Sequence, residues 1–223
     1  NRTVIGGSAC PTSMIKEFKE VHDVRVLHGW GMTEMSPIGL INQDKDTTKN
    51  LSGDAYLTQA SKQGRPIPGV EIKIIDEKGN DLPWNGKDVG NLLVRGPWVC
   101  RSYYDEDDGA SFRQGWFDTG DIASVDTNGY VLITDRAKDV IKSGGEWISS
   151  IELENIANSH PNVDQCAVIG VHHPKWEERP ILLVVQNKSS KANLESELLD
   201  WFQNKVAKWW IPDKVIFIDE LPL

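Results

Sequence analysis

The sequence predicts a fold that combines an α/β segment with an α+β domain. Three observations lead to this prediction. Residues 1–35 have the pattern strand, helix, strand; residues 64–135 contain short apolar runs separated by turn formers; and the rest of the chain alternates strands with two helices. The pattern changes at Asp135 to Lys138 without a Gly/Ser-rich linker. This predicts domains at 1–135 and 136–223 joined by a short hinge.

The first segment resembles the edge of an α/β sheet. A short apolar run ends at Ile5, then Ile15, Phe18 and Val21 recur at helical spacing, and a second apolar run follows at residues 24–27. These three pieces predict a strand, a helix and a second strand.

The middle of the chain is predicted to be mostly antiparallel β-structure. The polar stretch from Asn42 to Gln63 has little periodicity, so we expect a loop there. Beyond it, strands are expected at 70–74, 91–94, 121–125 and 130–133. Residues 126–129 include the Asn-Gly pair that is favoured in tight hairpins.

The last segment is expected to form a small α+β domain. Ser149 followed by Glu152 is a capping box, which predicts the start of a helix over about 150–159. A second helix is expected over about 193–208, and strands at 140–141, 166–171, 181–185 and 215–218.

Composition restricts the function classes. The chain has 223 residues, 24 Lys+Arg and 33 Asp+Glu, giving a net charge of −9. This balance argues against a non-specific binder of nucleic acid or anionic membranes. The longest strongly apolar run, 181–185, is far too short to span a membrane. Three widely spaced cysteines provide neither a disulfide framework nor a metal site, so we expect free thiols and a cytoplasmic protein.

Three groups of motifs follow one another along the chain. They are GGSACP at 6–11 with GWGMTEMSP at 29–37, GWFDTGD at 115–121, and TDRAKDVIKSGGEWISSIELE at 134–154. In this order and spacing the chain resembles the adenylate-forming superfamily of acyl-CoA synthetases, luciferases and peptide-synthetase adenylation domains, and within it the fatty-acyl-CoA ligases. The resemblance implies that 1–135 is the C-terminal part of a large AMP-binding domain, and that 136–223 is a small mobile domain.

The same resemblance implies an activity. Such enzymes join a fatty acid or related carboxylate to the AMP part of ATP, releasing pyrophosphate, and a thiol, usually that of coenzyme A, then displaces AMP. The implied ligands are therefore ATP or AMP, Mg²⁺ and coenzyme A. A homodimer of the longer parent protein is compatible with this resemblance.

The first motif pair would bind the adenine. Glycine beside small residues lets a backbone approach a flat ligand closely, and by resemblance Gly7, Ser8 and Ala9 line the adenine. Trp30 would stack on it, although the family more often has Tyr there. A strand-ending turn without a ligand explains the first three residues equally well.

The residues after Trp30 would meet the phosphates. By resemblance Gly31 and Met32 belong to the nucleotide site, Thr33 bonds the α-phosphate, and Glu34 holds Mg²⁺, which prefers carboxylate and phosphate oxygens. Thr33 and Glu34 would then be catalytic. Alternatively they cap or solvate a turn.

Two further residues would contact the nucleotide from the rest of the chain. An ionised carboxylate only accepts hydrogen bonds, which suits two vicinal hydroxyls, and the resemblance assigns the ribose hydroxyls to Asp121. Arg136 matches an arginine that contacts the ribose or phosphate. Asp after Gly is also ordinary turn chemistry, and Arg136 could be a solvated arginine at a strand end.

A loop with two adjacent glycines follows Lys142. By resemblance Lys142, Gly144 and Gly145 serve the thioester step, although a plain β-turn would also explain the glycines. The segment from Lys175 to Pro180 departs from the commonest form in the superfamily and looks like the fatty-acyl-CoA ligase version.

Two catalytic parts of the family are not found in the sequence. There is no phosphate loop rich in Ser, Thr and Gly, and the adenylation lysine that follows a Leu-Pro pair is absent, since the chain stops at Leu221-Pro222-Leu223. We therefore expect a C-terminal fragment that is inactive alone. Two alternatives stay open: an aryl-CoA ligase or carrier-protein-loading adenylation domain, and a non-catalytic nucleotide-binding module.

Overall fold

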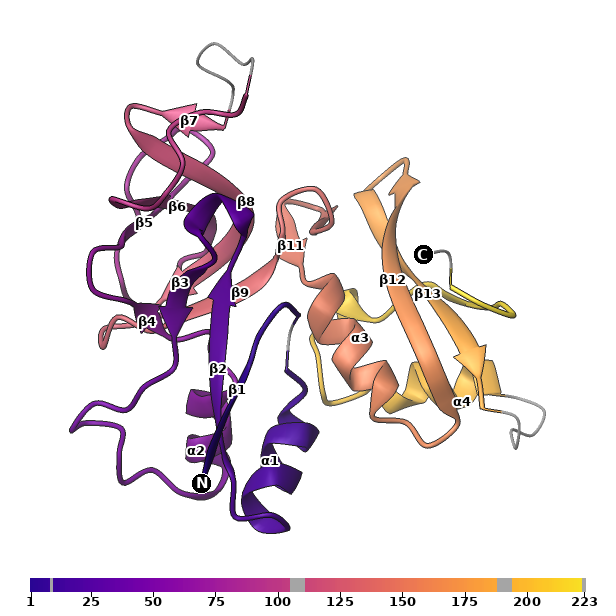
Figure 1. Ribbon diagram of the computed structural model, residues 1–223. Helices are drawn as coiled ribbons and strands as arrows, with labels where there is room; N and C mark the ends of the chain where they lie inside the picture. Colours follow the sequence, from indigo (N-terminus) through magenta and orange to yellow (C-terminus); the bar gives the residue numbers. More distant parts are fainter. Residues whose placement is uncertain (9, 105–110, 188–193, 222–223) are drawn as a thin grey trace. The chain divides into compact units, whose positions relative to one another are not determined.

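The computed structural model describes residues 1–8, 10–104, 111–187 and 194–221. The predictions for Ala9, for the first residue of the second helix and for Pro222-Leu223 therefore lie outside the described residues. The chain forms two compact units, Asn1–Thr134 (unit 1) and Asp135–Leu223 (unit 2) (Figure 1). The mixed α/β architecture expected from the sequence is confirmed.

Unit 1 begins with a four-stranded sheet of order β1-β2-β3-β4. Its elements are β1 (Arg2–Ile5), α1 (Thr12–Glu20), β2 (Arg25–Gly31), β3 (Ile38–Ile41) and β4 (Arg65–Pro66). The strands β1 and β2 run parallel, with Ile5 paired to His28. Helix α1 packs its fully buried Ile15 against Val26 of β2. Because β1 and β2 are parallel, their carboxyl ends lie at the same edge of the sheet.

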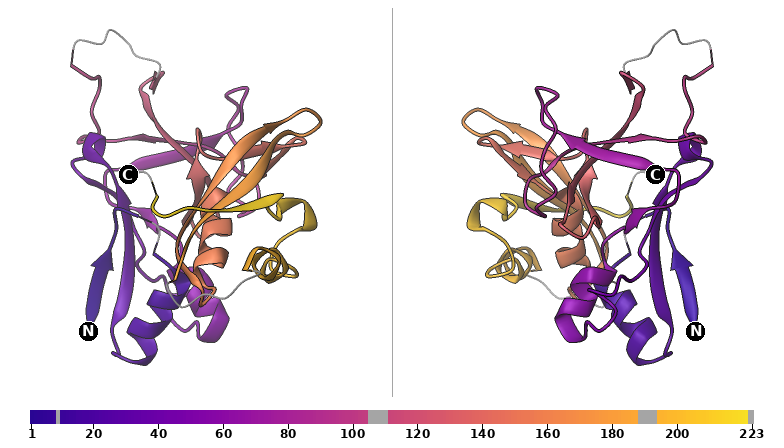
Figure 2. Two further views of the ribbon diagram at one scale, coloured as in Figure 1. Left: turned by 90° about the vertical axis from the view of Figure 1, so that its right-hand side faces the viewer. Right: turned by 90° about the vertical axis from the view of Figure 1, so that its left-hand side faces the viewer.

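The prediction of a loop from Asn42 to Gln63 is wrong in part, because helix α2 (Gly53–Ala60) lies within it, beside α1 (Figures 1 and 2). The buried Asn42 side chain donates to the carbonyls of Gln59 and Lys62, each at 2.7 Å. These bonds tie the C-terminal end of α2 to the start of the polar stretch. The apolar spacing of this stretch therefore does not reveal the helix, whose end is held by hydrogen bonds from a residue outside it.

The second sheet of unit 1 has the order β5-β6-β8-β7, with β9 paired to β8. The strands are β5 (Glu71–Ile75), β6 (Gly90–Arg95), β7 (Phe112–Arg113), β8 (Trp116–Val125) and β9 (Val131–Arg136). Fully buried Ile74, Leu92 and Val94 form the centre of its core. In the expected turn between β8 and β9, the carboxylate of Asp126 accepts bonds from the N–H groups of Asn128 and Tyr130.

Unit 2 is a five-stranded sheet with two helices on one face. Its order is β11-β10-β13-β12, and β14 pairs with β13 in parallel. The elements are β10 (Ile141–Ser143), β11 (Glu146–Ile148), α3 (Ser150–Asn158), β12 (Val163–His173), β13 (Glu177–Gln186), α4 (Leu194–Trp201) and β14 (Lys214–Phe217). Alternate residues such as Val168, Leu182 and Val215 pack against α3 and α4.

The helix ends of unit 2 show where the sequence was informative. Ser149 is the N-cap of α3, and its Oγ accepts a bond from the Glu152 N–H at 3.1 Å, so that prediction is confirmed. Helix α4 ends at Trp201 and not near 208. Asn204 adopts a left-handed φ of 62°, which an α-helix cannot continue. Among the described residues, no helix combines the length and apolar character needed to cross a membrane.

Candidate nucleotide site

The carboxyl ends of β1 and β2 form one edge of the candidate site. A Cβ on Gly6 would lie 2.9 Å from the backbone oxygen of Gly29, so the two backbones approach closely there. Gly7 then turns the chain with a φ of +91° and has open space beside its Cα. Ser8 is exposed. The turn at Gly7 and Ser8 therefore offers an accessible backbone surface beside the end of β2.

The end of β2 is irregular. Trp30 pairs with Leu40 but Gly31 pairs with Ile38, so Gly39 of β3 is an extra residue. A Cβ on Gly31 would collide with the carbonyl oxygen of Pro37. Gly31 is thus required by a close backbone approach, whether or not a ligand binds nearby.

Glu34 lies in a 3-10 turn, η1 (Thr33–Met35), directly after β2. Fully buried Met35 anchors this turn, Thr33 is exposed and Glu34 is half-buried. The Tyr103 hydroxyl donates to Glu34 Oε1 at 2.8 Å, and the Cys100 N–H donates to the Glu34 carbonyl, also at 2.8 Å. These two bonds fix the position of the Glu34 carboxylate and backbone.

Asp121 lies in a bulge of β8, not in a turn. Leu93 pairs with Asp118 and Asn91 pairs with Ile122, so Leu92 faces the three residues from Thr119 to Asp121. Gly120 has a φ of +71°, which favours glycine. Thr119 Oγ1 donates to the Leu92 carbonyl at 2.8 Å and accepts from the Asp121 N–H at 3.1 Å. Bulges redirect side chains, and this one sets the direction of the Asp121 side chain.

Trp30 and Asp121 meet across the two sheets of unit 1. The indole Nε1–H of Trp30 donates to Asp121 Oδ2 at 2.9 Å, although the residues are 91 positions apart. Asp121 is only 3% exposed. The structure therefore brings together the Trp30 and Asp121 segments, and Gly7, Ser8 and the η1 turn adjoin them at the end of β2.

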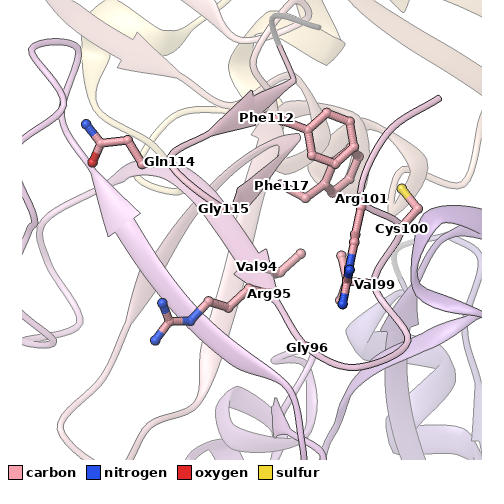
Figure 3. Close-up of a pocket in the computed structure, with 10 residues that line it drawn as sticks. All are labelled: Val94, Arg95, Gly96, Val99, Cys100, Arg101, Phe112, Gln114, Gly115 and Phe117. Atoms are coloured by element: carbon pink, nitrogen blue, oxygen red, sulfur yellow. The ribbon is translucent and has the colours of Figure 1, made fainter. Parts of the chain in front are cut away.

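A pocket of about 570 Å³ lies on the second sheet of unit 1. In Figure 3 the Phe112 and Phe117 rings lie near Cys100 and Arg101, with Arg95 and Gln114 on the other side. None of the predicted site residues that the structure describes lines this pocket. It adjoins η1 through the bond from Cys100 to Glu34, and we assign it no role in the candidate site.

The remaining predicted residues lie in unit 2. Arg136 is exposed, and its carbonyl accepts bonds from the Asp139 and Val140 N–H groups in a tight turn. Lys142 lies in β10, and Gly144 and Gly145 form the β10–β11 turn with φ values of +61° and +82°. The glycines are therefore required by the backbone of the turn itself.

The tip of the β12–β13 hairpin holds this glycine loop. The Gly144 N–H donates to the Trp176 carbonyl at 2.9 Å, and the Lys142 N–H donates to Glu178 Oε2 at 2.9 Å. Arg179 Nη1 donates to Ser143 Oγ at 3.2 Å. Sequence reasoning missed these partners, as it missed Tyr103, because each lies more than 30 residues from the group it contacts.

The donors of unit 1 suit two of the expected ligands, a nucleotide and Mg²⁺. Mg²⁺ in phosphate-binding sites takes one or two carboxylates together with phosphate oxygens, and Glu34 provides such a carboxylate. A partly exposed Trp30 ring beside an ionisable Asp121 is suited to a base and its ribose. The chemistry of these donors thus fits a nucleotide with a divalent cation.

The fold and the arrangement of these residues agree with the class of AMP-binding enzymes. The family model described as "AMP-binding enzyme" matches residues 1–104, and the one described as "AMP-binding enzyme C-terminal domain" matches residues 152–223. The chain therefore belongs to the AMP-binding enzyme family.

Similar proteins in this family are CoA ligases. The chain is 53% identical over 222 residues to a 3-methylmercaptopropionyl-CoA ligase of Ruegeria lacuscaerulensis, covering all of this chain and 41% of that protein. It is 49% identical to a medium-chain-fatty-acid–CoA ligase of Ectopseudomonas oleovorans, covering 99% and 40%. The chain thus spans about two-fifths of the length of the curated relatives it matches.

Solved structures agree with this assignment. The o-succinylbenzoate CoA synthetase of Bacillus subtilis in complex with its acyl-adenylate intermediate matches with a TM-score of 0.84 and 31% identity, covering 99% of this chain and 43% of that one. The same enzyme in complex with ATP and a magnesium ion matches with a TM-score of 0.83 and 30% identity, covering 100% and 43%.

Proposed function

We propose that the chain is the nucleotide-binding and C-terminal part of an ATP-dependent fatty-acyl-CoA ligase. In the first half-reaction a carboxylate oxygen attacks the α-phosphorus of ATP and pyrophosphate leaves, giving an acyl-adenylate. In the second, the thiol of coenzyme A attacks the acyl carbonyl and AMP leaves. The observation that carries this proposal is the contact between Trp30 and Asp121 beside the η1 turn.

The residues of unit 1 would bind the nucleotide. The Gly7–Ser8 turn and the Trp30 ring would receive the adenine, with Gly31 and Met32 completing the wall. Asp121 would accept bonds from the ribose hydroxyls. The exposed hydroxyl of Thr33 would donate to the α-phosphate, where negative charge grows as the carboxylate attacks.

Glu34 would hold the magnesium ion that accompanies ATP. Bound there, the ion would neutralise phosphate charge. The bond from Tyr103 to Oε1 would keep the carboxylate in place, and its remaining lone pairs suit a hard cation.

The residues of unit 2 would serve the thioester step. Arg136 would contact the nucleotide ribose or phosphate, and Lys142 with the Gly144–Gly145 turn would act when coenzyme A attacks. We propose that unit 2 turns as a body about Asp135 to Lys138 between the two steps. The carboxylate of Asp135 accepts a bond from the Ser150 N–H at 2.6 Å, which ties this residue to unit 2.

The acid is proposed to be a medium-chain fatty acid or a short thioether acid. This rests on the two relatives at about half identity, whose names carry those acids. An aromatic acid is the alternative. It is motivated by the o-succinylbenzoate CoA synthetase of Bacillus subtilis, whose sequence is 31% identical to this chain. The free cysteines accord with a reducing, cytoplasmic setting, and both this location and a homodimer remain predictions.

The test uses a protein of the relatives' full length that contains this chain. Pyrophosphate exchange and CoA-thioester formation are measured with octanoate, 3-methylmercaptopropionate and benzoate. We expect exchange with the first two acids, its loss in Glu34→Ala, and no exchange by the 223-residue chain alone. Turnover with benzoate only would reject the fatty-acid assignment, and no exchange with any acid would reject the ligase.

A further inference from the structure

The hydrogen bond between Trp30 and Asp121 links two parts of the candidate site that belong to different sequence motifs. Trp30 ends β2 in the first sheet, and Asp121 lies in the bulge of β8 in the second. The indole N–H reaches one carboxylate oxygen, Oδ2, at 2.9 Å. Hydrogen bonds to an ionised group are stronger than neutral ones.

Other contacts fix both partners. A Cβ on Gly39 would lie 3.1 Å from the Trp30 ring and would also meet Met35, so the ring is packed on that side. The bonds of Thr119 to Leu92 and to the Asp121 N–H hold the backbone of the bulge. The geometry of the carboxylate therefore depends on the indole as well as on the strand.

A carboxylate has about four lone-pair positions, and the indole uses one of them. A carboxylate can thus accept a ligand hydroxyl while it also accepts the indole N–H. A side chain that is already held in its binding orientation loses less conformational entropy when the ligand arrives. Phenylalanine at position 30 would keep an aromatic face but would not supply the N–H.

We propose that Trp30 is a positioning residue for the ribose. It receives the adenine on its face and, through its indole N–H, holds the Asp121 carboxylate in the orientation that accepts the ribose hydroxyls. Recognition of base and sugar is thereby coupled through one side chain. This inference rests on the proposed function, since it requires a nucleotide at this site.

The test is the ratio of two dissociation constants, that of 2′,3′-dideoxy-AMP over that of AMP, measured by calorimetry on the chain. We expect a ratio of about 10- to 100-fold in the wild type. In Trp30→Phe the ratio should fall about threefold or more, because the interaction energy between two residues in direct contact is typically large enough to change a binding constant by this factor. Affinity for dideoxy-AMP should change little, because the ring remains.

Two comparisons separate positioning from packing. Trp116→Phe removes an indole N–H from the same strand as Asp121 and should leave the ratio unchanged. Asp121→Ala should bring the ratio to about one. A purely structural role of Trp30 would weaken both ligands by the same factor and preserve the ratio.

The outcomes distinguish a failure of the positioning role from a failure of the proposed function. If the wild type binds AMP but the ratio is unchanged in Trp30→Phe, the positioning role is rejected and the proposed function stands. If the wild type binds no AMP, both are rejected. Trp30→Tyr is measured in parallel, since its hydroxyl lies away from the Nε1 position. Any aromatic variant with the wild-type circular dichroism spectrum and an unchanged ratio overturns the inference.

Discussion

Arg179 is expected to determine the local stability of the glycine loop. Its guanidinium donates to Asp213 Oδ1 at 2.7 and 2.9 Å, to Ser143 Oγ at 3.2 Å, and to the carbonyls of Trp209 and Ile211. It thus joins β13 to β10 and to the segment before β14. The Arg179 side chain is only 13% exposed.

The expected loss follows from these partners. Arg179→Met removes every one of these bonds and leaves two carbonyls without this donor. A bond to a charged group contributes about 1.5–3 kcal/mol. The contributions are not additive because the bonds share one guanidinium, and partial exposure of Asp213 reduces the share of that pair. We expect a loss of about 2–4 kcal/mol in the free energy of local opening.

The control is Lys175→Met on the same hairpin. Lys175 lies 4.5 Å over the exposed Trp176 ring, a contact that contributes about 0.5–1 kcal/mol. Native-state hydrogen exchange of the β10 and β14 amides reports the opening free energy of each variant. Equal protection in Arg179→Met and Lys175→Met would refute the account of this loop.

Three further predictions concern Gly144, Gly145 and Cys166 of unit 2. In urea unfolding, Gly144→Ala should lower the stability of the chain more than Gly145→Ala. Both glycines have a positive φ, but only a Cβ at Gly144 would lie 2.9 Å from the Trp176 ring. Equal losses would show that backbone strain alone determines the cost of both substitutions. Burial raises the pKa of the Cys166 thiol to about 12, so at pH 8 it should alkylate far more slowly than Cys100. Since the raised pKa means that the folded state retains the proton, the stability from this group should be complete below about pH 9 and decline toward pH 12; a flat alkaline stability curve would contradict this.

Local signals predicted much of the fold. The Asn-Gly turn after Asp126 and the cap at Ser149 depend on neighbours within four residues, and both are present. Helix α2 was missed because part of what holds its end is the side chain of Asn42, which lies outside the helix. Helix α4 was predicted too long because its apolar spacing continues to Phe202, whereas the backbone at Asn204 ends it.

The sequence predicted the individual segments of the candidate site but not which of their side chains contact one another. Motifs indicated Trp30, Glu34 and Asp121 one by one, but their partners are set by sheet pairing. The carboxylate of Glu34 meets Tyr103 from 69 positions away, and Trp30 meets Asp121 from 91. Such contacts have no local sequence pattern, so they required the structure.

Binding of AMP by the chain shows whether unit 1 contains a nucleotide site in which Asp121 takes part. Calorimetric titration of the wild type, Asp121→Ala and the exposed-carboxylate control Glu71→Ala compares one site residue with a neighbour on the same sheet. We expect AMP to bind the wild type and Glu71→Ala alike, and Asp121→Ala to weaken binding by about 10- to 100-fold. Equal affinity in all three proteins, or no binding by the wild type, would contradict it.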